Sequence, residues 1–139
     1  PLEVFDDPAN LFVAGFIGSP RINTLPAVAG PDGRSVAIEG DPALAVALPH
    51  LREALAPGRA LSLGIRPQHL VPSDAGLLRL RPDVVEQLGD VGYLHGETPG
   101  GTAVVAELPR RLGSLPSEMR LAFDPAHAFV FDPDGRRLR

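Results

Sequence analysis

The sequence predicts a mainly-β domain, a small barrel or sandwich of short strands preceded by one buried N-terminal helix. Three observations lead to this fold class. Short apolar runs alternate with turn residues along most of the 139-residue chain. The 16 prolines suit many strand ends and edges better than many helices. Only the stretch before residue 18 has the nearly continuous apolar pattern of a short buried helix.

The expected N-terminal helix has clear start and stop signals. Asp7 is a good N-cap, and Pro8 suits the first helical position because its missing N–H costs nothing there. The apolar side chains of residues 11–17 leave almost no polar face, so the helix should be packed between two surfaces. Gly18 can adopt the left-handed C-terminal turn and Pro20 prevents the helix from resuming, which directs the chain into the β region.

Three turn sequences rich in proline, glycine and aspartate each separate two short apolar runs, and they predict hairpin connections. They are residues 31–33 between 25–29 and 35–39, residues 98–101 between 91–97 and 102–108, and residues 132–135 between 127–131 and 136–138.

Two further runs predict strands because their apolar residues alternate. Leu61, Leu63 and Ile65 form one such run, and the other extends over residues 78–88, where Gly89 marks a bulge or turn. A helical turn or two is expected only at residues 50–56, ahead of a Pro-Gly pair.

Charge and composition weigh against several classes of function. A net charge of −4 does not favour nucleic acid, whose binding depends on clustered basic residues, and 5% aromatic content offers few stacking groups. Without cysteine there is no disulfide and no thiolate metal site. No run approaches the about 18 apolar residues of a membrane helix. Because the chain starts at Pro1, we expect a domain excised from a longer protein.

The sequence also lacks the motifs of an enzyme. All basic residues other than histidine are arginine, so a glycine-rich phosphate loop ending in Lys-Ser or Lys-Thr is absent. Gly89, Gly92 and Gly96 are spaced differently from a dinucleotide fingerprint. The four histidines lack the short spacing of a zinc site. We therefore expect no catalytic, cofactor-binding or metal-binding residue in this chain.

Four motifs, in order, cover nearly the whole chain and resemble one family. They are P-A-N-L-F-V-A-G-F-I-G-S-P-R-I-N at residues 8–23, L-S-L-G-I-R-P-Q-H-L-V-P at 61–72, V-E-Q-L-G-D-V-G-Y-L-H-G-E at 85–97, and F-D-P-D-G-R-R-L at 131–138. The chain resembles the C-terminal regulatory region of the ATP-binding subunits of sugar-importing ABC transporters of the maltose/multiple-sugar (MalK-like) type. That resemblance implies an oligonucleotide/oligosaccharide-binding (OB) type barrel, called TOBE or MOP-like.

The resemblance implies a division of the chain and a set of partners. Residues 1–23 would be the junction helix and linker from a missing ATPase domain, and residues 24–139 the TOBE/OB-type regulatory barrel. Two such domains would meet across the two-fold axis of the ATPase homodimer and offer a surface to regulatory proteins. The parent would bind Mg-ATP, contact transmembrane permease subunits through its ATPase domain, and lie in the cytoplasm at the inner face of the membrane.

Within that resemblance we nominate interface or regulatory residues. They are Phe16, Gly18, Ser19, Pro20 and Asn23 at the junction, and Gly64, Arg66, Pro67 and His69 on the barrel.

For each of these residues a turn or core role is equally consistent with the sequence. For Arg66 an interface or internal ion-pair role is favoured over ligand binding. The chain departs from the family at Gln68, Ile22 and Phe129, where Glu, Met and His are usual.

An alternative function is a small-ligand module that binds an oxyanion such as molybdate or tungstate, as related MOP-like barrels do. Such a site needs backbone N–H groups, hydroxyls or arginine focused on one anion. Residues 64–66 and Ser19 could contribute those groups.

Overall fold

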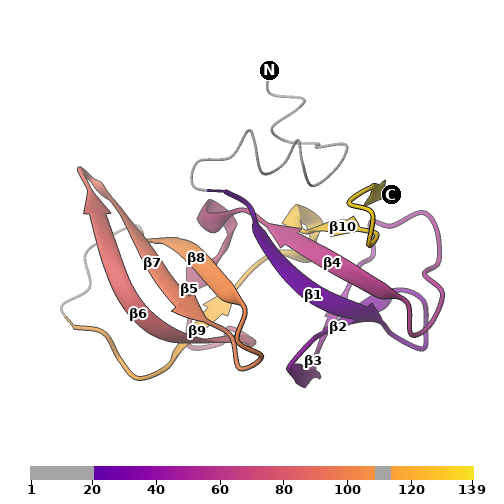
Figure 1. Cartoon of the computed structure of the whole chain (residues 1–139), viewed down its shortest axis with the longest axis horizontal. Coiled ribbons are helices and arrows are strands. Elements are labelled where there is room, and N and C mark those ends of the chain that lie inside the picture. Colours follow the sequence, from indigo (N-terminus) through magenta and orange to yellow (C-terminus); the bar gives the residue numbers. More distant parts are fainter. Residues whose placement is uncertain (1–20, 109–113) are drawn as a thin grey trace.

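The computed structural model of the chain describes residues 21–108 and 114–139, in which strands form almost all of the regular structure (Figure 1). Two short 3₁₀ helices, η1 (Pro67–His69) and η2 (Pro125–His127), interrupt them. The strands are β1 (Asn23–Ala29), β2 (Ser35–Ile38), β3 (Asp41–Ala47), β4 (Ala60–Ile65), β5 (Val71–Pro72), β6 (Leu78–Leu88), β7 (Val91–Glu97), β8 (Ala103–Leu108), β9 (Met119–Ala122), β10 (Phe129–Phe131) and β11 (Arg137–Leu138).

The strands form two antiparallel sheets that lie beside each other in Figure 1. The first sheet has the order β11-β10-β4-β1-β2-β3, and the second has the order β5-β9-β6-β7-β8. The mainly-β prediction is confirmed, with the strands distributed over two sheets instead of one closed barrel. The expected N-terminal helix falls on residues outside those described.

The predicted hairpins are present because the turn residues permit sharp reversals. β1 pairs with β2, β7 with β8, and β10 with β11, each antiparallel. β6 and β7 also form a hairpin, in which Gly89 adopts φ 63°, a left-handed conformation that other residues rarely adopt. The irregularity expected at Gly89 is therefore a turn, and β6 has its register shift at Pro82/Val84 instead.

The helical turns expected at residues 50–56 are wrong, because the described segment has no helix there. Leu51 and Leu55 are both buried, at the spacing of a helix face. The backbone N–H of Leu55 instead donates to the carbonyl of Gly33 at 2.8 Å, which ties the segment to the β1–β2 turn. Here tertiary hydrogen bonding overrides the local helical pattern.

The chain crosses between the sheets twice. It leaves the first sheet after β4 through η1, builds the second sheet, and returns through η2 to β10. β10 then pairs with the free side of β4, so Gly64 lies opposite Thr24 on one side and Phe129 on the other. The last strands are thus part of the first sheet, and both 3₁₀ helices lie at the crossings.

The two sheets share one apolar core. The alternation expected in β4 is confirmed, since Leu61, Leu63 and Ile65 are buried in this core together with Leu80 and Leu94 of the second sheet. Full burial of such a side chain stabilises a fold by about 1.5–3 kcal/mol. The apolar faces of the two sheets are therefore buried against each other.

Polar and backbone contacts also join the sheets at their margins. Arg79 of β6 lies 3.4 Å from the largely buried carboxylate of Asp41 in β3. Nearby, Gly40 of the β2–β3 turn lies so close to Gly100 of the β7–β8 turn that any side chain at Gly40 would overlap it. These contacts fix how the two sheets sit against each other.

The β1–β2 turn should show a pH dependence that arises from Asp32. Its carboxylate accepts hydrogen bonds from the Arg34 N–H and the Ser35 hydroxyl, both at 2.9 Å, and these bonds hold the pKa of Asp32 below its ordinary value of 3.8. Because folding lowers the pKa of Asp32, its ionised carboxylate stabilises the fold above pH 3.8. This stabilisation is lost as the pH falls through the folded-state pKa. A carbon-detected NMR titration should give a midpoint below 3.8, and the stability difference between wild type and Asp32→Ala should shrink in acid. A midpoint at or above 3.8 would contradict this assignment.

Candidate functional site

Asn23, the first residue of β1, connects the two sheets directly. Its side chain is buried, with 5% exposure. Its Nδ2 donates to the carbonyl of Val105 at 2.8 Å, and the Val105 N–H donates to Asn23 Oδ1 at 2.7 Å. β8 is the last strand of the second sheet, so the carboxamide supplies the pairing that another strand would give. Asn23, nominated from the sequence as an interface residue, joins the sheets within the molecule.

Gly64 leaves space for a small apolar cluster on the face of the first sheet that points away from the shared core. A Cβ at Gly64 would lie 2.7 Å from the ring of Phe131 and 3.1 Å from the end of Ile22. Ile22, Phe129 and Phe131 are buried together as a separate cluster. Side chains alternate between the faces of a strand, so β4 and β10 contribute to the shared core and to this cluster.

Arg66 and Arg137 both lie near the ring of Phe129. The Arg66 guanidinium is 2% exposed and lies 6.0 Å from the ring centroid, and that of Arg137 lies 4.6 Å from it. Attraction between a guanidinium and an aromatic face orients such side chains. Burial lowers the pKa of Arg137, and the neighbouring charge of Arg139 lowers it further. Phe129, which stands where the family usually has His, therefore places an aromatic ring beside two guanidinium groups.

His69 and His127 stack on each other, with ring centroids 4.1 Å apart and an angle of 18° between the rings. Each is the last residue of a 3₁₀ helix, His69 of η1 and His127 of η2. Pro67 begins η1 and is buried, whereas Pro125 begins η2 and is half-buried. The stacked rings thus bring together the two segments that cross between the sheets.

The structure brings four of the nine nominated residues into one region and separates the others. Gly64, Arg66, Pro67 and His69 follow one another closely in the chain. Gly64 lies opposite Phe129, Arg66 lies 6.0 Å from its ring, and Pro67 begins the 3₁₀ helix whose last residue, His69, stacks on His127. Asn23 instead binds β8. The remaining four, Phe16, Gly18, Ser19 and Pro20, lie outside the described residues.

Three residues that take part in these contacts were not nominated from the sequence: Val105, His127 and Arg137. A signal for His127 was present, because Pro-Gln-His at residues 67–69 and Pro-Ala-His at 125–127 repeat one pattern. Nothing local indicated Val105, which is 82 positions from Asn23.

The side chains of this region include guanidinium groups, imidazoles and phenyl rings that lie against one another. Across the described residues, no group of three or more histidine, aspartate or glutamate side chains could hold a metal ion. In that same part of the chain, no helix is long and apolar enough to span a membrane.

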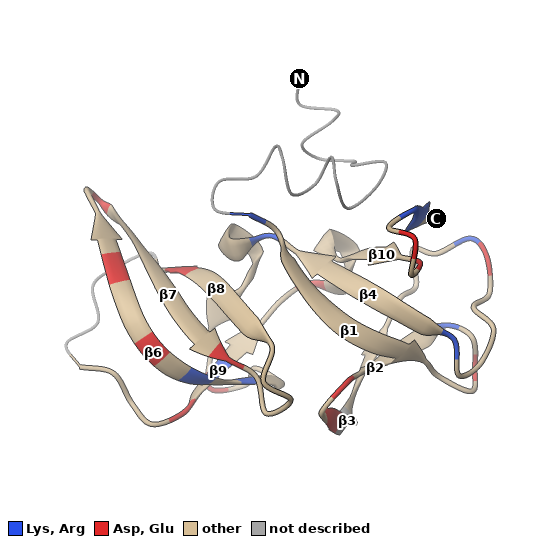
Figure 2. Cartoon of the chain, viewed as in Figure 1, with Lys and Arg blue, Asp and Glu red and all other residues tan. Residues whose placement is uncertain are grey.

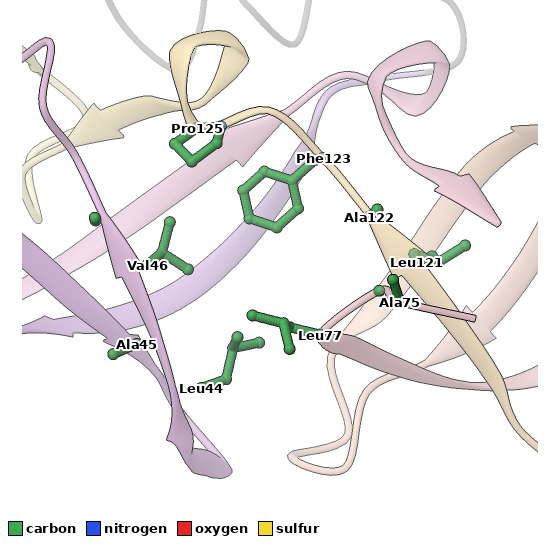
Figure 3. A pocket seen from close by; sticks show the side chains of 11 residues that line it. Leu44, Ala45, Val46, Ala75, Leu77, Leu121, Ala122, Phe123 and Pro125 are labelled. Atoms are coloured by element: carbon green, nitrogen blue, oxygen red, sulfur yellow. The ribbon is translucent and has the colours of Figure 1, made fainter. Parts of the chain in front are cut away.

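A groove of about 320 Å³ lies between β3 and the segments around β9 (Figure 3). Val46, Leu77 and Phe123 border it, and the labelled side chains around it are all apolar. A groove lined in this way offers no group for acid–base or nucleophilic chemistry.

Comparison with a solved structure defines the class of fold. The chain resembles a crystal structure of the cytoplasmic molybdate-binding protein ModG with a TM-score of 0.52 and 12% sequence identity. The match covers 80% of this chain and 96% of that one. The chain therefore has a MOP-like β fold of two antiparallel sheets.

Sequence comparisons show the family. The MalK OB fold domain matches residues 18–70, and the TOBE domain matches residues 63–131. The chain is 38% identical to the lactose transport ATP-binding protein LacK of Rhizobium radiobacter, over all of this chain and 40% of that protein. It is 39% identical to the sn-glycerol-3-phosphate import ATP-binding protein UgpC of Ruegeria pomeroyi, over 99% of this chain and 38% of that protein. With MalK of Yersinia pestis the identity is 46% over 71% of this chain.

The chain belongs to the family of MalK-type OB-fold and TOBE domains, which form C-terminal regions of sugar and glycerol-3-phosphate ABC importer ATPases. It spans about two fifths of the length of the curated relatives LacK and UgpC.

Replacing Asn23 should weaken the joint between the sheets. Asn23→Ala removes two hydrogen bonds and leaves backbone groups of Val105 without them, so we expect the free energy of unfolding to fall by about 2–3 kcal/mol. Asn23→Asp should also destabilise, because the carboxylate replaces the donor that faces the Val105 carbonyl. Urea unfolding measures both changes. Thr24→Ala, at the next, half-buried position, is the control and should cost about 1 kcal/mol or less. If Asn23→Asp is as stable as the wild type, the hydrogen bond donated by Asn23 Nδ2 does not contribute to stability.

Proposed function

We propose that this chain is the C-terminal regulatory and dimerisation domain of the ATPase subunit of a sugar ABC importer, and that it takes part in the ATP-driven transport cycle. One observation carries the proposal. LacK and UgpC match 99–100% of this chain but extend well beyond it, and both are named as transport or import ATP-binding proteins. The parent would bind Mg-ATP in the part that this chain does not include, because this chain has no Lys for a phosphate loop.

The proposal includes the layout and partners expected from the sequence. Residues 1–23 would be the junction from the ATPase domain, and residues 24–139 the regulatory domain. Two copies would associate through the parent homodimer, the ATPase domains would contact the permease subunits, and the assembly would lie at the inner face of the membrane. Regulatory proteins would act by binding one state of the transport cycle more tightly than another.

The nominated residues support this function chiefly from the interior. Asn23, Gly64, Arg66 and Pro67 are buried, and His69 is half-buried. A two-fold interface requires a rigid, self-complementary surface on each copy. We propose that these residues set the relative position of the two sheets, and that exposed residues make the contacts with partners.

Spin labels on the full-length parent test the dimerisation role. This chain has no cysteine, so Asp134→Cys in the exposed β10–β11 turn introduces a label site unique within the domain. If the two domains stay together while the ATPase halves open and close, the distance between the two labels should be the same with and without Mg-ATP. A label in the ATPase half is the control and should move. A distance that changes as much as the control would contradict the proposal.

Binding of an oxyanion remains the second candidate function, favoured by the ModG-like fold alone. Arg66, one of the groups that could contribute to an anion site, is 2% exposed and lies near Phe129, and the space at Gly64 is closed by Phe131. This packing supports the protein-contact function instead.

A thermal-shift measurement separates the two functions, because a ligand that binds only the folded state raises its stability. With molybdate, tungstate, Mg-ATP or an oligosaccharide we expect the Tm of this chain to change by less than about 4 °C, the shift that corresponds to about 1 kcal/mol. A larger rise with molybdate or tungstate alone would favour the oxyanion function. Chloride at the same ionic strength is the control.

A further inference from the structure

A second cavity, of about 300 Å³, is bordered by the segment after β3 and by the β10–β11 region. None of its lining residues borders the apolar groove described above. Four of the side chains that line it are basic: His50, Arg52, Arg137 and Arg139. Among the described residues that line this cavity, none is acidic. We call it the basic cavity, and its lining contrasts with the net charge of −4 of the chain.

Two hydrogen bonds hold the walls of the basic cavity together. His50 Nε2 lies 3.2 Å from the carbonyl oxygen of Ala128, and because a carbonyl only accepts, the ring nitrogen donates. The backbone N–H of Glu53 donates to the carbonyl of Arg139 at 3.4 Å. Residues 50–53 are therefore tied to residues on both sides of the β10–β11 hairpin, and the cavity is a product of the folded chain.

Packing positions the guanidinium group of Arg137. It lies 4.6 Å from the ring centroid of Phe129, which is buried. Burial lowers the pKa of Arg137, and the charge of Arg139 lowers it further, so the two positive charges oppose each other. A bound anion would offset that repulsion. The planar guanidinium also presents a fork of N–H donors that matches the two oxygens of a carboxylate.

The size and lining of the basic cavity indicate the kind of ligand. Its volume is at the lower end of the range for small-molecule sites. Arg52 comes from one wall and Arg137 and Arg139 from the other, and Figure 2 shows basic residues at the C-terminal end beside β10. A single tetrahedral oxyanion needs donors focused on one point. Basic groups on two walls instead suit a ligand whose negative charge is divided between separate acidic groups.

We propose that the basic cavity binds a small organic acid with two or three carboxylate groups. The carboxylates would pair with Arg52, Arg137 and Arg139, and the carbon skeleton would lie against Phe129 and Leu138, which also line the cavity. This site is separate from residues 64–66, at which an oxyanion was considered. The proposal does not depend on the transport role, since it rests on this cavity alone.

Citrate, which carries three carboxylates, is the probe that tests the proposal. Acetate, inorganic phosphate and chloride at the same pH and ionic strength are the controls. Titrated into the ¹⁵N-labelled chain, citrate should shift the amide signals of residues 50–53 and 128–139 in a saturable manner. It should bind at least about tenfold more tightly than acetate or phosphate.

Three variants show which groups hold the probe. Arg52→Gln/Arg139→Gln changes two exposed positions, so it should weaken citrate binding about tenfold with little change in Tm. Arg59→Gln/Arg120→Gln removes the same charge from exposed positions elsewhere and should leave binding unchanged. Arg137→Lys keeps the charge but loses the fork of donors, and should weaken binding several-fold.

The results that would overturn the proposal are equally specific. It is overturned if citrate does not bind, if its shifts map to another surface, or if the two glutamine pairs weaken binding equally. Phosphate that binds as tightly as citrate would indicate a site for one tetrahedral anion instead. Unchanged binding by Arg137→Lys would show general attraction to positive charge, and would also overturn it.

Discussion

The paired hydrogen bonds between Asn23 and Val105 are the contact on which the arrangement of the two sheets depends most directly. β8 ends the second sheet, and an edge strand left open invites other chains. The carboxamide closes that edge at Val105 with one donor and one acceptor, as a neighbouring strand would. Apolar packing between the sheets is strong but non-directional, so a polar contact of this kind selects one arrangement among several with similar burial.

The crossings between the sheets receive a second set of contacts. η1 and η2 carry the chain out of the first sheet and back, and the His69–His127 stack brings the two crossings together. Arg66 begins one crossing and lies near Phe129, which follows the other. The motif at residues 61–72 therefore includes one of the two crossings between the sheets, and the histidine stack holds the two crossings together.

Features that a few neighbouring residues encode were predicted, whereas features that depend on contacts between distant residues were not. Turns such as residues 31–33 and 98–101 were predicted correctly, because the preference of glycine, proline and aspartate for reversed backbone acts over a few residues. The helical turns at residues 50–56 were wrong, because Leu51 and Leu55 have helical spacing but the backbone bonds to Gly33. The roles of the site residues were not predictable, since Asn23 and Arg66 face partners that are distant in sequence.

The sequence by itself determined the β character, the hairpins and the family, because each of these is encoded by neighbouring residues or by a short motif. The division into two sheets, the closing of β8 by Asn23 and the meeting of the two Pro-x-His segments were decided only by the tertiary structure. The physical reason is the same in each case. Such contacts join residues many positions apart, so their energy exists only after the apolar faces of both sheets have come together.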